Sequence, residues 1–141
     1  MFVLPQLTEQ RDVLEKFAED LRYGPLKAET TPVARQTAEL PVAFYQALLG
    51  KRLKSSCGYW PEGKATLDDA EDLMLALTCD RAPIADGLDI LELGCGWGSQ
   101  CLWMAESFQN SRVVGVTNSQ VQRKFIERQA SARRLSNLKI V

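Results

Sequence analysis

The sequence contains no histidine, which removes the side chain that most often serves as a general base near neutral pH. Its four cysteines form no C-x-x-C pair, so we expect no metal site. No apolar run approaches the ~18 residues that a membrane helix needs, and the N-terminus lacks the pattern of a signal peptide. These absences predict a cytoplasmic protein with reduced thiols and no integral membrane segment.

The charged residues are nearly balanced, with 17 lysines and arginines against 18 aspartates and glutamates. A net charge of −1 gives no general attraction to nucleic acid, so we predict no nucleic-acid partner. We interpret the small basic cluster of Lys51, Arg52 and Lys54 as a solvated surface, with a weak phosphate or lipid-headgroup contact as its alternative. The oligomeric state is left open.

The most informative segment is Asp89–Ser99, which reads DILELGCGWGS. An apolar run leads into three glycines, Gly94, Gly96 and Gly98, and a predicted helix follows at once. A strand, a glycine turn and a helix in this order form the opening of a nucleotide-binding α/β unit. Glycine allows φ > 0 and lets a ligand approach the main chain, and the turn leads that ligand to the N-terminus of the helix.

Two common ligand classes fit this segment poorly. A dinucleotide site would show G-x-G-x-x-G and an acidic residue about 20 positions further on. Here Ser99 stands where the third small residue is needed, and the second strand, Arg112–Val116, ends in Thr117 and Asn118 without a carboxylate. The G-K-[ST] of a phosphate loop is also missing. A nicotinamide or flavin enzyme is therefore disfavoured, and a tight turn in an unrelated α/β protein stays open at this point.

The remaining pattern predicts alternating helices and strands. A helix capped by Thr8 and a short helix over 42–49 precede a loop over 55–64. A third helix begins at Thr66, with Asp69 in a capping box, and its apolar face carries Ala70, Leu73, Met74 and Leu77. After the glycine turn we expect a helix over 99–108, a strand over 112–116, a helix over 120–135 capped by Ser119 and Gln122, and a strand over 138–141.

This order predicts an α/β fold in which an N-terminal helical cap precedes the first half of a Rossmann-like, doubly wound parallel sheet. We divide the chain into a helical extension and cap loop over 1–65 and a cofactor-binding domain over 66–141. A parallel sheet normally continues past a reversal in strand order, where its ligand crevice forms. The second domain would therefore be incomplete at its C-terminus, and we expect a truncated product or a fragment of a longer enzyme.

Four motifs in a fixed order give the chain a resemblance to a known family. They are LLGKRLKSSCGYW over 48–60, TLDDAE over 66–71, the glycine turn with Glu92 two residues before it, and GVTNSQVQ over 115–122. Together they resemble the class I S-adenosylmethionine-dependent methyltransferases, in particular the cyclopropane-fatty-acid synthase and coclaurine N-methyltransferase-like group. The resemblance covers about residues 50–141.

The resemblance implies S-adenosyl-L-methionine as the cofactor and a set of residues that bind it. Three glycines would border its methionine part and ribose, three polar residues would lie near its ribose and adenine, and two serines would close over it from the cap. The implied cofactor-binding residues are Ser55, Ser56, Glu92, Gly94, Gly96, Gly98, Thr117, Asn118 and Gln122. Cys57 aligns with a cysteine near the bicarbonate pocket of the cyclopropane synthases, and as an alternative it is an ordinary loop residue.

The implied reaction is transfer of a methyl group to a small amine or to an unsaturated lipid acyl chain. Asn118, Ser119 and the run over 49–54 favour the amine branch slightly. No catalytic residue is identified, because the family's acid–base residues would lie beyond Val141. The alternative is a non-catalytic binding or interaction module of the same fold.

Overall fold

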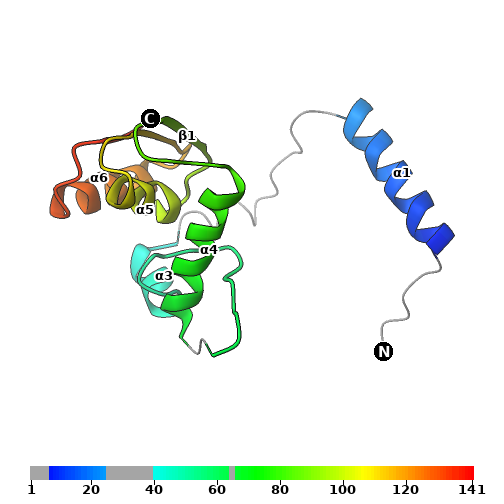
Figure 1. Cartoon of the computed structure of the whole chain (residues 1–141), viewed down its shortest axis with the longest axis horizontal. Helices are drawn as coiled ribbons and strands as arrows, with labels where there is room; N and C mark the ends of the chain where they lie inside the picture. Colours follow the sequence, from blue (N-terminus) through cyan, green and yellow to red (C-terminus); the bar gives the residue numbers. More distant parts are fainter. Residues whose placement is uncertain (1–6, 25–39, 64–65) are drawn as a thin grey trace. The chain divides into compact units, whose positions relative to one another are not determined.

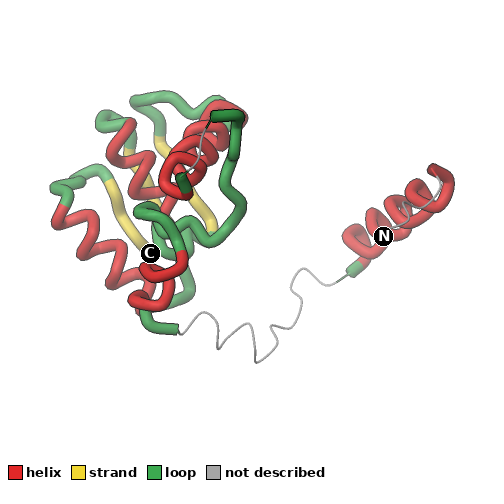
Figure 2. The backbone as a smooth tube through the Cα atoms, turned by 90° about the horizontal axis from the view of Figure 1, so that it is seen from below, coloured by secondary structure: helices red, strands yellow, loops and turns green. Residues whose placement is uncertain are grey.

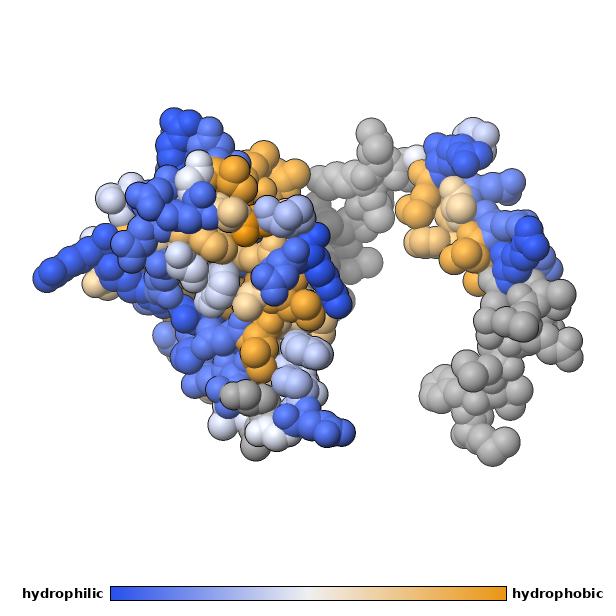
Figure 3. All heavy atoms as spheres, viewed as in Figure 1, coloured by the Kyte–Doolittle hydropathy of each residue, from blue (hydrophilic) through white to orange (hydrophobic). Residues whose placement is uncertain are grey.

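The computed structural model describes residues 7–24, 40–63 and 66–141. It divides the chain into two compact units, Met1–Arg35 and Gln36–Val141 (Figure 1). The first unit contains α1 (Leu7–Tyr23), which begins one residue before the predicted cap position, Thr8. Figure 3 shows hydrophobic side chains along one side of α1 and hydrophilic ones along the other. Across the described residues, no helix is both long and apolar enough to cross a bilayer.

The second unit is built around a parallel three-stranded sheet with the order β1-β2-β3. Two crossover helices connect the strands (Figure 2). The elements are β1 (Asp89–Leu93), α5 (Ser99–Ser107), β2 (Arg112–Val116), α6 (Gln120–Ala132) and β3 (Leu138–Ile140). The α5 and α6 helices contact each other and pack against the buried side of the strands, so they cover the same face of the sheet. The predicted α/β fold is confirmed.

The two faces of the sheet differ in burial because side chains alternate along each strand. Ile90, Val113 and Ile140 point toward the helices and are buried in the core. Leu91 and Leu93 point to the other face and remain 62% and 75% exposed. The described residues leave this second face open, with exposed leucines beside the charged pair of Asp89 and Arg112.

Among the described residues of this unit, α3 (Val42–Leu48) and α4 (Leu67–Arg81) precede the sheet. The Thr66 hydroxyl accepts a hydrogen bond from the Asp69 backbone N–H (3.1 Å) and donates one to the Asp69 carboxylate (2.7 Å), so the predicted cap is confirmed. The predicted apolar face of α4 is displaced. Leu75 is the most buried of the large apolar side chains on this helix, and Glu71 is buried with it.

An aromatic contact joins the glycine turn to the cap region. The buried ring of Trp97 packs against Tyr45 of α3, with ring centroids 4.9 Å apart, and against Phe125 of α6, at 5.4 Å. Residues 40–63 thus pack within the same unit as the sheet. The boundary that we predict between residues 65 and 66 falls inside this unit, and the division into a cap and a cofactor domain stays a prediction.

Candidate functional site

The glycine turn sits at the carboxyl end of β1 and is tied to the end of β2. The backbone N–H groups of Gly94 and Cys95 both donate to the Val116 carbonyl, each at 2.9 Å. All three glycines of the turn have positive φ, +75° at Gly94, +55° at Gly96 and +83° at Gly98. Any residue with a Cβ would be strained at each of these positions. The turn therefore depends on glycine for its backbone conformation.

The three glycines nevertheless have different surroundings. A Cβ built on Gly94 or Gly96 would meet no atom within 4 Å, so the backbone there is open. A Cβ on Gly98 would lie 2.7 Å from Cγ1 of Ile126 in α6. Gly98 is also the N-cap residue of α5. The first two glycines thus leave room for a ligand, whereas the third lets α5 and α6 approach each other.

Two pockets meet at this turn, and Gly94 and Gly96 line both of them. The first pocket has a volume of about 510 Å³ and is bounded by the loop over 53–57, by α4 and by the start of α5. The second has a volume of about 370 Å³ and is bounded by the end of β2 and the start of α6. An elongated ligand that crosses the glycine turn can occupy both.

The first pocket carries two charged side chains of opposite sign, Lys54 and Glu92. Lys54 is only 9% exposed, and its ammonium donates a hydrogen bond to the Ser56 hydroxyl. One carboxylate oxygen of Glu92, Oε2, is buried and has no hydrogen-bond partner among the described residues. Burial raises the pKa of the Glu92 carboxyl above its ordinary value, and interactions with Cys101 offset only part of this effect. A buried polar atom without a partner costs free energy, which a ligand with a donor group would recover.

The second pocket is polar but uncharged. The Thr117 hydroxyl donates to the side-chain carbonyl oxygen of Gln122 (2.8 Å) and accepts a hydrogen bond from the Ser119 backbone N–H (3.2 Å). The Ser119 hydroxyl accepts from the Gln122 backbone N–H (3.4 Å) and caps α6 as predicted, while the Gln122 side chain turns to Thr117 instead of closing the capping box. Asn118 completes the rim. The residues that line this pocket include no carboxylate.

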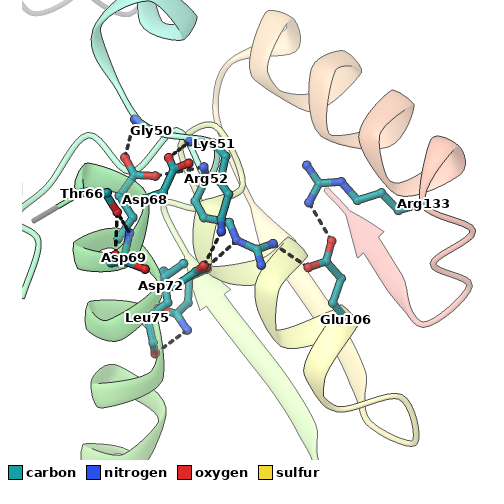
Figure 4. A network of polar contacts seen from close by, with 12 residues as sticks. Gly50, Lys51, Arg52, Thr66, Asp68, Asp69, Asp72, Leu75, Glu106 and Arg133 are labelled. Carbon is teal, nitrogen blue, oxygen red and sulfur yellow. Dashed lines mark hydrogen bonds and ion pairs between the residues drawn. The ribbon is translucent and has the colours of Figure 1, made fainter. Parts of the chain in front are cut away.

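Arg52 and Lys54 of the basic cluster are largely buried and do not form the solvated surface that the sequence predicts, whereas Lys51 is exposed. The Arg52 guanidinium, 19% exposed, contacts Asp72 at 2.7 Å and Glu106 at 2.5 Å (Figure 4). Arg133 contacts the other oxygen of Glu106 at 2.8 Å. Although burial opposes it, these hydrogen bonds lower the pKa of the Glu106 carboxyl below its ordinary value. Arg52 thus belongs to a partly buried network that joins the loop to α4, to α5 and to the C-cap of α6.

The structure brings together all of the predicted cofactor-binding residues except Gly98, which lines neither pocket. Those in the first pocket are Ser55, Ser56, Glu92, Gly94 and Gly96, and those in the second are Gly94, Gly96, Thr117, Asn118 and Gln122. Cys57 also lines the first pocket. Sequence reasoning missed Lys54 because it grouped this lysine with its basic neighbours. Its position directly before the two serines was the signal that could have identified it.

Comparison with known proteins identifies a family and several relatives to which the chain is similar. The sequence profile of the family described as mycolic acid cyclopropane synthetase matches residues 28–140. (S)-Coclaurine N-methyltransferase from Thalictrum flavum subsp. glaucum is 41% identical over 133 residues, which are 94% of this chain and 37% of that protein. Cyclopropane-fatty-acyl-phospholipid synthase from Escherichia coli (strain K12) is 30% identical over 95 residues, 67% of this chain and 24% of that protein.

A solved structure matches the chain closely. The crystal structure of coclaurine N-methyltransferase bound to N-methylheliamine and SAH superposes with a TM-score of 0.89 and 37% sequence identity. The match covers 99% of this chain and 40% of that one. The chain thus spans well under half the length of the relatives that it matches.

Proposed function

The chain belongs to the mycolic acid cyclopropane synthetase family, and on this premise we propose that it binds S-adenosyl-L-methionine across the glycine turn. It would form the donor-binding part of a methyltransferase. The observation that carries the proposal is the pairing of one charged pocket with one uncharged pocket, joined at Gly94 and Gly96. The donor has the same division, because its methionine part is zwitterionic and its adenosyl part is neutral and polar.

The first pocket suits the amino-acid end of the donor. The Lys54 ammonium would attract the α-carboxylate, and Glu92 would attract the α-ammonium group. The unpartnered Oε2 of Glu92 supports this assignment, because a buried carboxylate oxygen is stabilised by a charged donor. Ser55 and Ser56 add hydroxyl groups to the same wall. The fit of this pocket to a zwitterion is the basis for placing the methionine end here.

The second pocket suits the adenosyl end. Thr117, Asn118 and Gln122 supply a hydroxyl and two amides, which can each both donate and accept hydrogen bonds. The carboxylate that holds the ribose of a nicotinamide dinucleotide is not among the lining residues. The positive φ of Gly94 and Gly96, with open space where a Cβ would stand, lets the ribose approach the backbone. The nicotinamide alternative is correspondingly weaker.

The bound donor supplies an activated methyl group on a sulfonium. The residues of this chain hold that donor in one orientation, which is a large part of catalysis when two reactants must be aligned. We propose a small amine as the acceptor, because the N-methyltransferase relative is 41% identical over 133 residues and the lipid-modifying one 30% identical over 95. An unsaturated lipid acyl chain is the alternative acceptor, and a cytoplasmic location stays a prediction. We assign no catalytic residue.

A second candidate function rests on the open face of the sheet. Leu91 and Leu93 are more than half exposed there. A face of a parallel sheet that carries exposed leucines is normally covered. The chain would then act as a binding or interaction module that pairs with another polypeptide.

Isothermal titration calorimetry on the purified chain separates these candidates. We expect S-adenosylmethionine and S-adenosylhomocysteine to bind at least about ten times more tightly than NAD. Lys54→Gln and Glu92→Gln should each lower the affinity for S-adenosylhomocysteine by about tenfold or more. Both should leave 5′-methylthioadenosine, which lacks the amino-acid end, nearly unaffected. Lys124→Gln, an exposed position on α6, is the matched control.

Two results would count against the proposal. Equal loss of affinity for S-adenosylhomocysteine and 5′-methylthioadenosine in Lys54→Gln and Glu92→Gln would show that the methionine end does not occupy the first pocket. An absence of binding to any adenosyl compound, together with concentration-dependent self-association in analytical ultracentrifugation, would favour the interaction module.

A further inference from the structure

The loop that forms one wall of the first pocket is attached to α4 at both of its ends. At the beginning, the backbone N–H groups of Gly50, Lys51 and Arg52 all bind carboxylates of α4. At the end, the Tyr59 N–H donates to the Ala70 carbonyl at 3.0 Å. The pocket-lining residues 53–57 lie between these two attachments. The position of the wall therefore depends on α4.

The first attachment consists of three consecutive amides and two acidic side chains, and we name it the amide latch. The Gly50 N–H donates to Oε1 of Glu71 and the Arg52 N–H to Oε2, both at 2.9 Å. The Lys51 N–H between them donates to Oδ1 of Asp68 at 2.8 Å. Successive backbone amides of this kind form a concave site for an anion. Figure 4 shows Gly50, Lys51 and Asp68 meeting at the start of α4.

Glu71 is the central residue of the latch. It is 1% exposed, and each of its oxygens accepts one backbone N–H. A carboxylate this deeply buried is tolerated only when hydrogen bonds satisfy it. Gly50 leaves space for this contact, because a Cβ there would lie 2.6 Å from Oδ1 of Asp68 and 2.8 Å from Oε2 of Glu71. The close approach of the loop to the two carboxylates therefore requires glycine at this position.

The residue after the latch redirects the chain toward the pocket. Leu53 is buried and has φ of +53°, a left-handed conformation that is strained for a leucine. Such a conformation persists only where neighbouring contacts hold it. Lys54, Ser55 and Ser56 follow immediately and line the first pocket. The hydrogen bonds of Glu71 thus lie one residue from the strained turn that aims these three side chains.

We propose that Glu71 is a positioning residue for donor binding. It holds the amides of Gly50 and Arg52, and thereby sets the place of Lys54, Ser55 and Ser56 at the methionine end of the site. The expected effect on donor binding rests on the proposed function, whereas the attachment of the loop through Glu71 does not. Glu71 lines neither pocket, so it acts only through the loop.

The test compares Glu71→Gln with Glu127→Gln in the full 141-residue chain. Glu71→Gln keeps the size of the side chain and replaces one acceptor oxygen with a donor, which opposes one of the two backbone N–H groups. Glu127→Gln removes a carboxylate from the exposed Arg123–Glu127 pair on α6, away from the loop. Hydrogen exchange by mass spectrometry and calorimetry with two adenosyl compounds are measured on both variants.

In Glu71→Gln we expect amide exchange over 50–57 to accelerate by about tenfold or more, while exchange in β2 and α5 stays as in the wild type. Affinity for S-adenosylhomocysteine should fall by about tenfold, and affinity for 5′-methylthioadenosine by less than about threefold. A merely structural role would change both ligands together and would raise exchange throughout the unit. Glu127→Gln should change none of these quantities.

Several outcomes would overturn the proposal. Unchanged exchange over 50–57 in Glu71→Gln would show that the latch does not hold the loop. Faster exchange with unchanged affinity for S-adenosylhomocysteine would show that the loop position does not matter for binding. If the wild type binds no adenosyl compound, the proposed function fails, and the exchange measurement alone then decides whether Glu71 holds the loop.

Two further variants keep the test decisive if Glu71→Gln does not fold. Asp68→Asn weakens only the Lys51 amide contact, at a partly exposed side chain. Gly50→Ala introduces a Cβ against both carboxylates from the side of the loop. Both should accelerate exchange over 50–57 and lower the affinity for S-adenosylhomocysteine more than that for 5′-methylthioadenosine. Wild-type behaviour in both would overturn the proposal.

Discussion

Gly98 and Ile126 are in direct contact, because a Cβ on Gly98 would lie 2.7 Å from Cγ1 of Ile126. The same turn holds Gly94 and Gly96, where a Cβ would meet nothing within 4 Å. One short motif therefore combines a glycine needed for packing of the helices with two that leave the backbone open. These two roles can be separated experimentally.

Gly98→Ala should lower the free energy of unfolding by about 2–4 kcal/mol, because overpacking against Ile126 adds to the strain of an alanine at positive φ. Gly96→Ala should lower it by only about 1 kcal/mol, from the strain alone. In the folded variants, Gly96→Ala should lower the affinity for S-adenosylhomocysteine more than Gly98→Ala does, because Gly96 lines both pockets and Gly98 lines neither. Urea denaturation and calorimetry measure the two effects. Equal destabilisation by both changes would contradict the division of roles.

Glu92→Gln should raise stability at pH 7 while it weakens donor binding. The pKa of Glu92 is raised in the folded state by burial. Ionisation of Glu92 therefore costs no folding free energy below its unfolded pKa, where the carboxyl is protonated in both states. As the pH rises through the folded pKa, the free energy of unfolding falls. Glutamine removes this loss, and we expect a gain of about 1 kcal/mol at pH 7. Thermal melts from pH 4 to pH 8 test this, and a variant less stable than the wild type at pH 7 would contradict it.

Glu106→Gln should change the acid limb of the stability curve. Although burial opposes the shift, hydrogen bonds from Arg52 and Arg133 lower the pKa of Glu106. The stability that it contributes is thus present above its unfolded pKa and is lost as the pH falls through the lower, folded pKa. Because both arginines remain partly exposed, we expect Glu106 to contribute only about 0.5–1 kcal/mol to the free energy of unfolding at pH 7. Urea midpoints at pH 7 and pH 3 should differ less in Glu106→Gln than in the wild type.

Trp97→Ala should destabilise the second unit by about 3–5 kcal/mol, as expected for removal of a buried tryptophan. It would also separate α3 from α6, since the Trp97 ring contacts Tyr45 and Phe125. Near-ultraviolet circular dichroism and urea denaturation measure the loss. Trp60→Ala, at an exposed ring, is the matched control and should change stability by less than about 0.5 kcal/mol.

The order of elements could be predicted because its signals are local. Thr66 and Asp69 lie three residues apart and form a cap within one helical turn. The three strands β1, β2 and β3, which pair in parallel, also follow from short apolar segments of the sequence. Capping, periodicity and the conformational freedom of glycine act over a few residues.

Two of the errors arose where partners lie far apart in the sequence. Arg52 was predicted to be solvated, but it contacts Glu106, 54 residues further on. Glu71 breaks the expected apolar face of α4 because its carboxylate binds amides 19 and 21 residues earlier. No local pattern contains these relationships.

The sequence by itself determined the strand, glycine turn and helix, the family to which the chain belongs, and the polar residues that follow β2. Only the tertiary structure decided that Lys54 lines the first pocket, that Gly98 packs against Ile126, and that Glu71 accepts the backbone amides of Gly50 and Arg52. The physical reason is that local conformation depends on neighbouring residues, whereas burial and contacts depend on which distant segments the fold brings together.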